Sequence, residues 1–181
     1  AHASHKGSFG DLIVVGGAAG MGGAAMLAAR AGLAAGAGRV LLVRLDGSIE
    51  PDPVRPEVMP RLADDMLRPH VLRRSTVVCG CGGGEVVRAV LPAVLHHADR
   101  LVLDADALNA IAADPGLRAS LRSRGGRHAA TVVTPHPLEA ARLLGIDSSA
   151  VQAARLAAAG RLCDELQCTV VLKGSGTVIA H

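Results

Sequence analysis

The sequence contains almost no aromatic residues: Phe9 is its single phenylalanine, and it has neither tryptophan nor tyrosine. Proteins that bind nucleic acid stack bases on aromatic rings or carry a strongly basic face. The formal net charge here is only +3, and the basic residues are scattered along the chain. We therefore expect no nucleic-acid partner.

Long apolar runs are also missing. No segment reaches the roughly 18 uninterrupted apolar residues of a membrane-spanning helix, and the N-terminal stretch 1–6 lacks the apolar core of a signal peptide. We expect a cytoplasmic protein without a membrane partner. The 181 residues fit one domain, since domains commonly have roughly 100–200 residues.

Cysteine is scarce, with Cys79, Cys81, Cys163 and Cys168 as the four examples. The first pair follows a predicted strand and the second lies near the end of a predicted helix. Their spacings differ from those of zinc ribbons. A metal site built from both pairs is one alternative, but we prefer buried free thiols.

The sequence does contain a regular alternation of short β-branched runs with longer helical patterns. Such runs suit strands covered on both faces. Their alternation with helices predicts an α/β fold with a mainly parallel sheet, right-handed crossovers and helices on both faces. The stretch 44–60 contains four prolines and predicts a long loop. Strands are predicted at 12–15, 39–43, 76–79, 101–103, 131–134, 169–172 and 178–180, and helices at about 24–36, 61–72, 85–97, 139–144 and 149–166, with another after 109.

Two glycine-rich stretches, 16–23 and 80–84, follow predicted strands and lead into predicted helices. Without Cβ atoms in the way, backbone N–H groups of such turns can meet a phosphate, and the helix dipole favours an anion. Lys173 begins the turn 173–177, which also contains glycine, and can add a positive charge. These features predict phosphate binding; the alternatives are tight turns and a solvated lysine.

Carboxylates and a histidine follow two other predicted strands. Asp104 and Asp106 come after one, while His136 stands between two prolines after the next, with Glu139 in the first turn of the following helix. The carboxyl ends of parallel strands share one edge, where open α/β sheets bind ligands. The three carboxylates could hold Mg²⁺ directly or through water. The alternatives are an N-cap role for Asp106, a capping Glu139 and a solvated His136.

The sequence matches one of two common nucleotide-binding fingerprints only in part and lacks the other. The stretch 20–25 matches G-x-G-x-x-A, and Asp46 lies about where a ribose-binding acid is expected. However, residues 16–19 separate this stretch from the strand, whereas the first glycine normally follows the strand at once. A Walker loop is absent. We therefore predict that nucleotide binding uses another geometry.

In combination, six motifs resemble the ADP- or ATP-dependent NAD(P)H-hydrate dehydratases of the ribokinase-like superfamily. The resemblance extends over essentially the whole chain and implies a three-layer α/β/α fold with a mainly parallel central sheet. In vitamin kinases of the same superfamily, asparagine takes the place of His136, which favours the dehydratase. The motifs are His5-Lys-Gly-Ser-Phe-Gly10, Gly22-Gly-Ala-Ala25, Gly80-Cys-Gly82, Leu103-Asp-Ala-Asp-Ala-Leu-Asn109, Thr134-Pro-His-Pro-Leu-Glu139 and Val171-Leu-Lys-Gly-Ser-Gly-Thr177.

The resemblance implies repair of hydrated NADH or NADPH: ADP or ATP with Mg²⁺ phosphorylates the C6 hydroxyl, and phosphate then leaves. It also implies a homo-oligomer. Asp104 and Glu139 are expected to position metal or water. The hydrate-binding positions carried over are Ala24, Gly82 and His136, together with Asp106, and the nucleotide-binding positions are Lys173, Gly174, Ser175, Gly176 and Thr177.

Two features depart from the family pattern. Cys81 stands where the family usually has proline. The family's G-T-G-D motif, with its catalytic aspartate, normally lies beyond the strand that ends this sequence at His181. We therefore expect residues 1–181 to be one ribokinase-like domain that lacks its C-terminal part. The alternative functions are a small-molecule kinase for a sugar or vitamin, and an inactive nucleotide-binding module.

Overall fold

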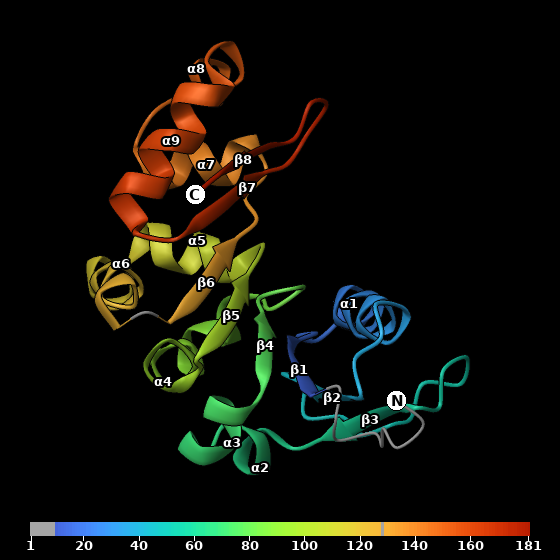
Figure 1. Cartoon of the computed structure of the whole chain (residues 1–181). Coiled ribbons are helices and arrows are strands. Elements are labelled where there is room, and N and C mark those ends of the chain that lie inside the picture. The colour runs from blue at the N-terminus through green and yellow to red at the C-terminus, as the bar shows by residue number, and fades with distance from the viewer. Residues whose placement is uncertain (1–9, 128) are drawn as a thin grey trace, which may run out of the picture.

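The computed structural model describes residues 10–127 and 129–181 and arranges their strands in one eight-stranded sheet. The strand order is β3-β2-β1-β4-β5-β6-β7-β8, and every neighbouring pair is parallel except β7 and β8 (Figure 1). The predicted mainly parallel sheet is confirmed. The stretch 5–9 of the first family motif lies outside the described residues. The strands are β1 Asp11–Gly16, β2 Arg39–Arg44, β3 Val58–Arg61, β4 Thr76–Cys79, β5 Arg100–Leu103, β6 Ala130–Val133, β7 Thr169–Leu172 and β8 Val178–Ala180.

Helices lie on both faces of this sheet. In β1, Val14 packs with Ala25 and Ala29 of α1, whereas its neighbours Ile13 and Val15 pack into the cluster formed with the later helices. Because successive strand residues point to opposite faces, α1 lies on one face and α3 to α9 on the other. The helices are α1 Gly22–Ala34, α2 Ala63–Met66, α3 Pro69–Arg74, α4 Leu91–His97, α5 Asp106–Ala113, α6 Pro115–Arg122, α7 Pro137–Leu144, α8 Ser148–Ala153 and α9 Arg155–Leu166, with short 3₁₀ turns η2 Glu85–Ala89 and η3 Gly125–Arg127.

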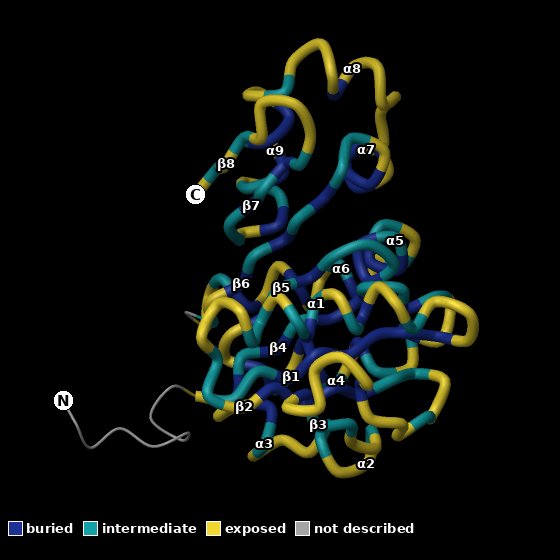
Figure 2. The backbone as a smooth tube through the Cα atoms, turned by 90° about the vertical axis from the view of Figure 1, so that its right-hand side faces the viewer, coloured by how far each residue is buried: buried dark blue, intermediate teal, exposed yellow. Residues whose placement is uncertain are grey.

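The main hydrophobic core fills the face opposite α1, and Figure 2 shows the buried segments gathered along the strands. On the α1 face, Val102, Val132 and Val171 of β5, β6 and β7 are only partly buried, although the residues beside them in each strand are buried. Helices therefore cover both faces of the sheet most completely at β1 and β2. None of the helices in the described ranges is long and apolar enough to cross a membrane.

One predicted loop is partly wrong. The proline-rich stretch 44–60 ends in strand β3, which pairs with β2 and places Pro60 opposite Leu42. Proline has no N–H to donate and is therefore confined to edge strands or bulges. β3 is an edge strand, so one of its sides needs no partner.

Three predicted helices are divided. The helix predicted at 61–72 becomes α2 and α3, with Pro69 as the first residue of α3, and that at 85–97 becomes η2 and α4, with Pro92 in the first turn of α4. Proline is favoured in a first turn but breaks a helix interior, because it lacks the N–H that the ladder requires. The third, 149–166, breaks at Ala154, whose φ is −137°.

The chain reverses its direction of travel across the sheet between β1 and β4. From β1 it moves outward to β2 and β3, and then returns to lay β4 on the other side of β1. In an open α/β sheet, the carboxyl ends of the strands on either side of such a switch point are splayed apart by diverging helices, and ligands bind there. The glycine stretches that follow β1 and β4 therefore flank the expected binding edge.

Asp52 anchors the loop after β2 to α1. Its buried carboxylate accepts two hydrogen bonds from the Arg30 guanidinium, each 2.6 Å long, and one of 2.9 Å from the Val54 N–H. The Arg30 hydrogen bonds hold the pKa of Asp52 well below its usual range. This paired arrangement fixes the loop against the second half of α1.

We predict that Asp52→Asn lowers the stability of the protein at neutral pH, and that the difference from the wild type shrinks in acid. The folded pKa lies below that of an unfolded aspartate, about 3.9, so the carboxylate stabilises the fold above that pH. The contribution is lost as the pH falls through the folded pKa. Urea unfolding between about pH 7 and about pH 2.5 measures the difference.

The matched control is Asp65→Asn, because the Asp65 pair with Arg68 is exposed. This variant should follow the wild type at every pH, since exposed ion pairs contribute little to stability. A deficit of Asp52→Asn that stays constant on acidification would contradict the assignment.

Candidate active site

The glycine stretches after β1 and β4 are joined by backbone hydrogen bonds. The N–H of Gly17 donates to the carbonyl of Cys81 at 3.0 Å, and that of Ala18 donates to the carbonyl of Gly82 at 2.7 Å. A Cβ on Gly16 would collide with the Cys81 carbonyl oxygen. Only glycine permits this close approach of the two chains.

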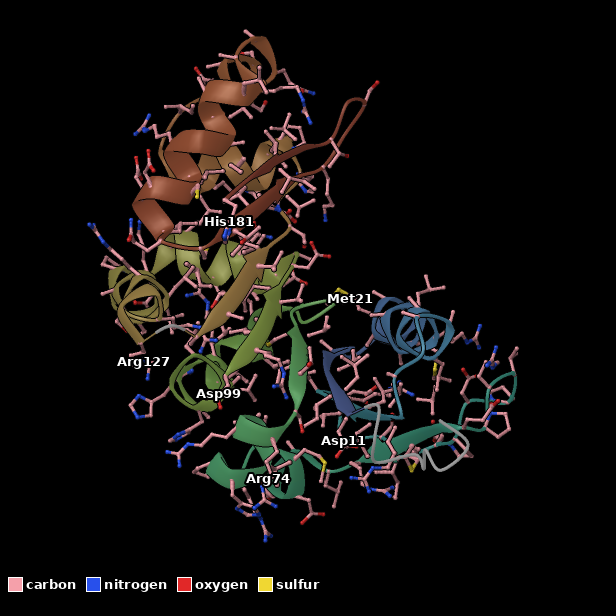
Figure 3. All side chains as sticks on the ribbon, viewed as in Figure 1. Asp11, Met21, Arg74, Asp99, Arg127 and His181 are labelled. Carbon is pink, nitrogen blue, oxygen red and sulfur yellow. The ribbon has the colours of Figure 1, made fainter. Side chains whose placement is uncertain are left out.

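The second stretch also contacts the end of β5. Gly80 has a φ of +116°, and a Cβ there would collide with the backbone oxygen of Asp104. Met21 also packs against the second glycine stretch, because a Cβ on Gly82 would lie 2.6 Å from the Met21 carbonyl oxygen. Figure 3 shows Met21 beside the loop that follows β4, between that loop and α1.

Ala24 and Gly82, two predicted hydrate-binding positions, are neighbours. Ala24 lies exposed in the first turn of α1, and a Cβ on Gly82 would be 3.1 Å from the Ala24 Cβ. No side chain caps the start of α1. Its first N–H groups and the positive end of its dipole therefore face the edge where the two glycine stretches meet.

Asp104 connects three strand ends. Its Oδ1 accepts a hydrogen bond from Lys173 Nζ at 2.6 Å and another from Thr134 Oγ1 at 2.8 Å. Lys173 follows β7 and Thr134 follows β6, so a single carboxylate oxygen ties β5 to both. Lys173 is therefore ion-paired, and its side chain is also 41% exposed, so the structure does not decide between a phosphate-binding and a solvated lysine. The sequence did not indicate this role of Thr134, because a threonine at the end of a strand carries no local signal of its partner.

Asp106 ties the second glycine stretch to α5. It is the first residue of α5, and its Oδ2 accepts a hydrogen bond of 2.9 Å from the N–H of Gly84. The N-cap position belongs to Ala105, so the N-cap alternative for Asp106 is wrong. Its carboxylate therefore helps to fix the loop that contains Gly82.

His136 and Glu139 form a reciprocal cap at the start of α7. The His136 Nδ1 accepts from the N–H groups of Leu138 and Glu139 at 3.1 and 3.3 Å, while Glu139 Oε2 accepts from the His136 N–H at 2.8 Å. The other Glu139 oxygen lies 3.3 Å from His136 Nε2. This geometry requires a neutral imidazole with its proton on Nε2. The ring remains 45% exposed and can reach a ligand.

The predicted metal ligands Asp104 and Glu139 each have hydrogen-bonding partners within the protein. Glu139 is only 3% exposed, and both of its oxygens face His136. Within residues 10–127 and 129–181, no group of three or more His, Cys, Asp and Glu side chains could hold a metal ion. A metal role for these two carboxylates stays a prediction.

All four cysteines are free thiols. Burial raises the pKa of Cys79 and of Cys168 to about 12 and that of Cys81 to about 11. The Cys81 Sγ lies 3.8 Å from Asp104 Oδ2, where the neutral thiol can donate. The preferred interpretation of the cysteines as free thiols is confirmed, although Cys79 alone is fully buried.

The turn 173–177 joins β7 to β8 and projects beyond the sheet (Figure 1). The Lys173 N–H donates to the Pro135 carbonyl at 2.9 Å. Gly174 and Gly176 have φ values of +136° and +70°, a region that favours glycine. In the described part of the chain, the N–H groups of residues 174–177 donate to no protein acceptor, and all four residues are exposed. These N–H groups and Lys173 form a turn suited to bind phosphate.

The predicted positions thus converge on one edge. Ala24, Gly82 and Asp106 belong to the glycine-loop side, and the turn 173–177 meets them through the Lys173–Asp104 pair. His136 lies on the turn that Lys173 contacts through the Pro135 carbonyl.

Comparison with known proteins identifies the family. The family model described as NAD(P)H-hydrate dehydratase matches residues 12–181. An ADP-dependent (S)-NAD(P)H-hydrate dehydratase from Neisseria meningitidis is 41% identical over an alignment of 181 positions that covers 98% of this chain and 60% of that protein.

Two solved structures share the fold of this chain. An ADP/ATP-dependent NAD(P)H-hydrate dehydratase from Bacillus subtilis, co-crystallised with ATP and Mg²⁺, has a TM-score of 0.74 and 28% identity, over 99% of this chain and 63% of that one. A ribokinase-like superfamily protein from Enterococcus faecalis has a TM-score of 0.77 and 24% identity, over 100% of this chain and 63% of that one.

The chain therefore spans about three fifths of the length of these relatives. Its fold is that of the ribokinase-like proteins, as the sequence motifs implied. Because the family match extends from β1 to the end of β8, the chain belongs to the NAD(P)H-hydrate dehydratase family.

Proposed function

We propose that this chain carries the hydrate-binding and nucleotide-binding edge of an enzyme that uses ADP or ATP to dehydrate damaged NADH or NADPH. The observation that carries the proposal is the 2.6 Å ion pair between Lys173 and Asp104. It joins a turn with free N–H groups to the glycine loops at the switch point. A nucleotide bound at the turn and a hydrate bound at the glycine loops would meet at the Lys173–Asp104 ion pair.

The chemistry requires a better leaving group than hydroxide. The C6 hydroxyl oxygen of the hydrated ring attacks the terminal phosphorus of the nucleotide, and the bond to the departing nucleotide oxygen breaks. The C6–O bond then breaks, phosphate leaves, and the ring nitrogen lone pair stabilises the cation. Loss of a C5 proton restores the double bond. Such phosphoryl transfer depends mainly on positioning and charge stabilisation.

The hydrate is proposed to lie over the first turn of α1 and the second glycine loop, at Ala24 and Gly82. Ala24 and Gly82 themselves carry no large side chain, and Met21 lies beside Gly82 as a further apolar contact. Asp106 holds the loop through Gly84. The Nε2–H of His136 would donate to an oxygen of the substrate.

The nucleotide phosphates are proposed to bind the turn 173–177, where Lys173 supplies the charge and Gly174, Ser175, Gly176 and Thr177 supply N–H groups. Mg²⁺ would enter with the phosphates, since it commonly binds substrate phosphates and only one or two carboxylates. Asp104 and Glu139 would act through its water shell. The base that deprotonates the C6 hydroxyl is not assigned to a residue of this chain. A cytoplasmic homo-oligomer stays a prediction.

The proposal is tested by mixing chemically hydrated NADH with ADP or ATP and Mg²⁺ and following the near-ultraviolet band of the reduced ring. This chain should be compared with a version that carries any native sequence following His181. Recovery of the band, with stoichiometric release of phosphate, is the expected result for a protein that contains the base. A stable phosphorylated product would instead establish a kinase, and nucleotide binding without turnover by either version would establish a binding module.

We predict that two substitutions at His136 separate capping from substrate binding. Asparagine caps helices well, whereas alanine does not, so His136→Ala should lower the free energy of unfolding by about 1 kcal/mol and His136→Asn should not. Both should raise the KM for the hydrate about tenfold, because both remove the ring donor. Urea unfolding and steady-state kinetics measure the two effects.

The matched control is Asp114→Ala, because Asp114 caps α6 by accepting from the N–H groups of Gly116 and Leu117. It should lose similar stability without a change in KM. An unchanged KM in His136→Asn would contradict the assignment of His136 to the hydrate.

We predict that Lys173→Met raises the Kd for ADP and ATP by about tenfold or more, because it removes a charge that meets phosphate. Calorimetric titration of each nucleotide with Mg²⁺ measures this. Arg142→Met is the control, since it removes a positive charge whose partner is the Asn109 side chain. Equal weakening in both variants would indicate a general charge effect and would contradict a specific phosphate contact.

A further inference from the structure

Arg155 lies directly behind the turn that carries the proposed phosphate contacts. It is the first residue of α9, and its Nη2 donates to the carbonyls of Leu172, Lys173 and Gly176 at 3.0, 3.1 and 3.3 Å. Its Nη1 donates to Gln152 Oε1 at 2.8 Å. One guanidinium therefore contacts both ends of the turn.

The guanidinium also lies close to Gly174. A Cβ on Gly174 would lie 3.2 Å from both terminal nitrogens of Arg155. The turn has few contacts of its own: Thr177 Oγ1 donates to the Gly174 carbonyl at 3.1 Å, and the Lys173 N–H donates to Pro135. Two left-handed glycines without side chains do not fix a turn by themselves, since glycine is the most flexible residue.

Holding these carbonyls also determines where the N–H groups point. In a trans peptide, the C=O and the following N–H point in opposite directions within one plane. When Arg155 draws in the carbonyls of Lys173 and Gly176, the N–H groups of Gly174 and Thr177 are turned away from it. Both belong to the N–H groups of residues 174–177, which donate to no protein acceptor among the described residues.

We propose that Arg155 is a positioning residue that sets the phosphate-binding shape of the turn 173–177, through its contacts with three carbonyls. This inference rests on the proposed function, because it assumes that nucleotide binds this turn. Arg155 itself faces the carbonyl side of the turn, so it acts through the backbone and does not touch the phosphate. All three carbonyl contacts come from Nη2, while Nη1 is held by Gln152 Oε1. A lysine cannot replace Arg155, because its single ammonium nitrogen has no second arm that would hold it at the turn.

The test compares Arg155→Lys and Arg155→Ala with Arg161→Ala, which removes an arginine of the same helix that pairs with Glu165. Calorimetric titration of ADP with Mg²⁺ should give a Kd raised about tenfold in both Arg155 variants and unchanged in Arg161→Ala. The affinity for the hydrate alone should stay the same in all three. Because Arg155→Lys keeps the charge, its loss of affinity reports the shape of the turn. A wild-type Kd in Arg155→Lys would overturn the inference.

A second measurement separates this inference from the proposed function. Without nucleotide, the backbone amide resonances of Gly174 and Gly176 should shift in Arg155→Lys and stay in place in Arg161→Ala. If the wild type binds neither nucleotide, the proposed function of the turn fails, and the assignment of Arg155 to phosphate binding fails with it. If nucleotide binds normally but the glycine resonances do not move in Arg155→Lys, the positioning role alone is overturned.

Discussion

The close contact between the glycine loops after β1 and β4 is the constraint on which the site depends. Two backbones approach so closely there that a Cβ at Gly16 would meet a carbonyl oxygen. The contact lies where the chain reverses its direction across the sheet, so α1 and the later helices diverge to opposite faces on either side of it. The start of α1 thereby lies beside both glycine stretches at the carboxyl edge, and Ala24 in its first turn is exposed.

A second constraint links this contact to the far end of the sheet. Lys173 and Asp104 are partly exposed, and exposed ion pairs add little to stability, roughly 0–1 kcal/mol. Their importance is therefore positional: the Asp104 carboxylate receives both Lys173 and Thr134, and so fixes the ends of β5, β6 and β7 relative to one another. The other connections of the turn 173–177 are its strands, Arg155 and the bond from the Lys173 N–H to the Pro135 carbonyl.

The same residues serve the fold and the proposed chemistry. His136 uses one ring nitrogen to cap α7 and keeps the other for Glu139 or a ligand. Glu139, buried beneath it, holds the histidine backbone and orients the ring. A helix start that is capped by its own ligand-binding residue positions that residue rigidly, because changing its conformation would also release two N–H groups of the helix.

The sequence by itself determined the alternation of strands and helices, the parallel sheet and the set of chemical residues at the strand ends, because β-branched runs, glycine and proline act locally. It also indicated the family through motifs in fixed order. It did not indicate β3, since a proline in a strand is tolerated only at an edge, and an edge is defined by neighbours. Nor could it pair Lys173 with Asp104, or Arg155 with the carbonyls of the turn, because these contacts join residues far apart in the chain. Only the tertiary structure decided them: the order of strands in the sheet determines which loops meet, and no local pattern encodes that order.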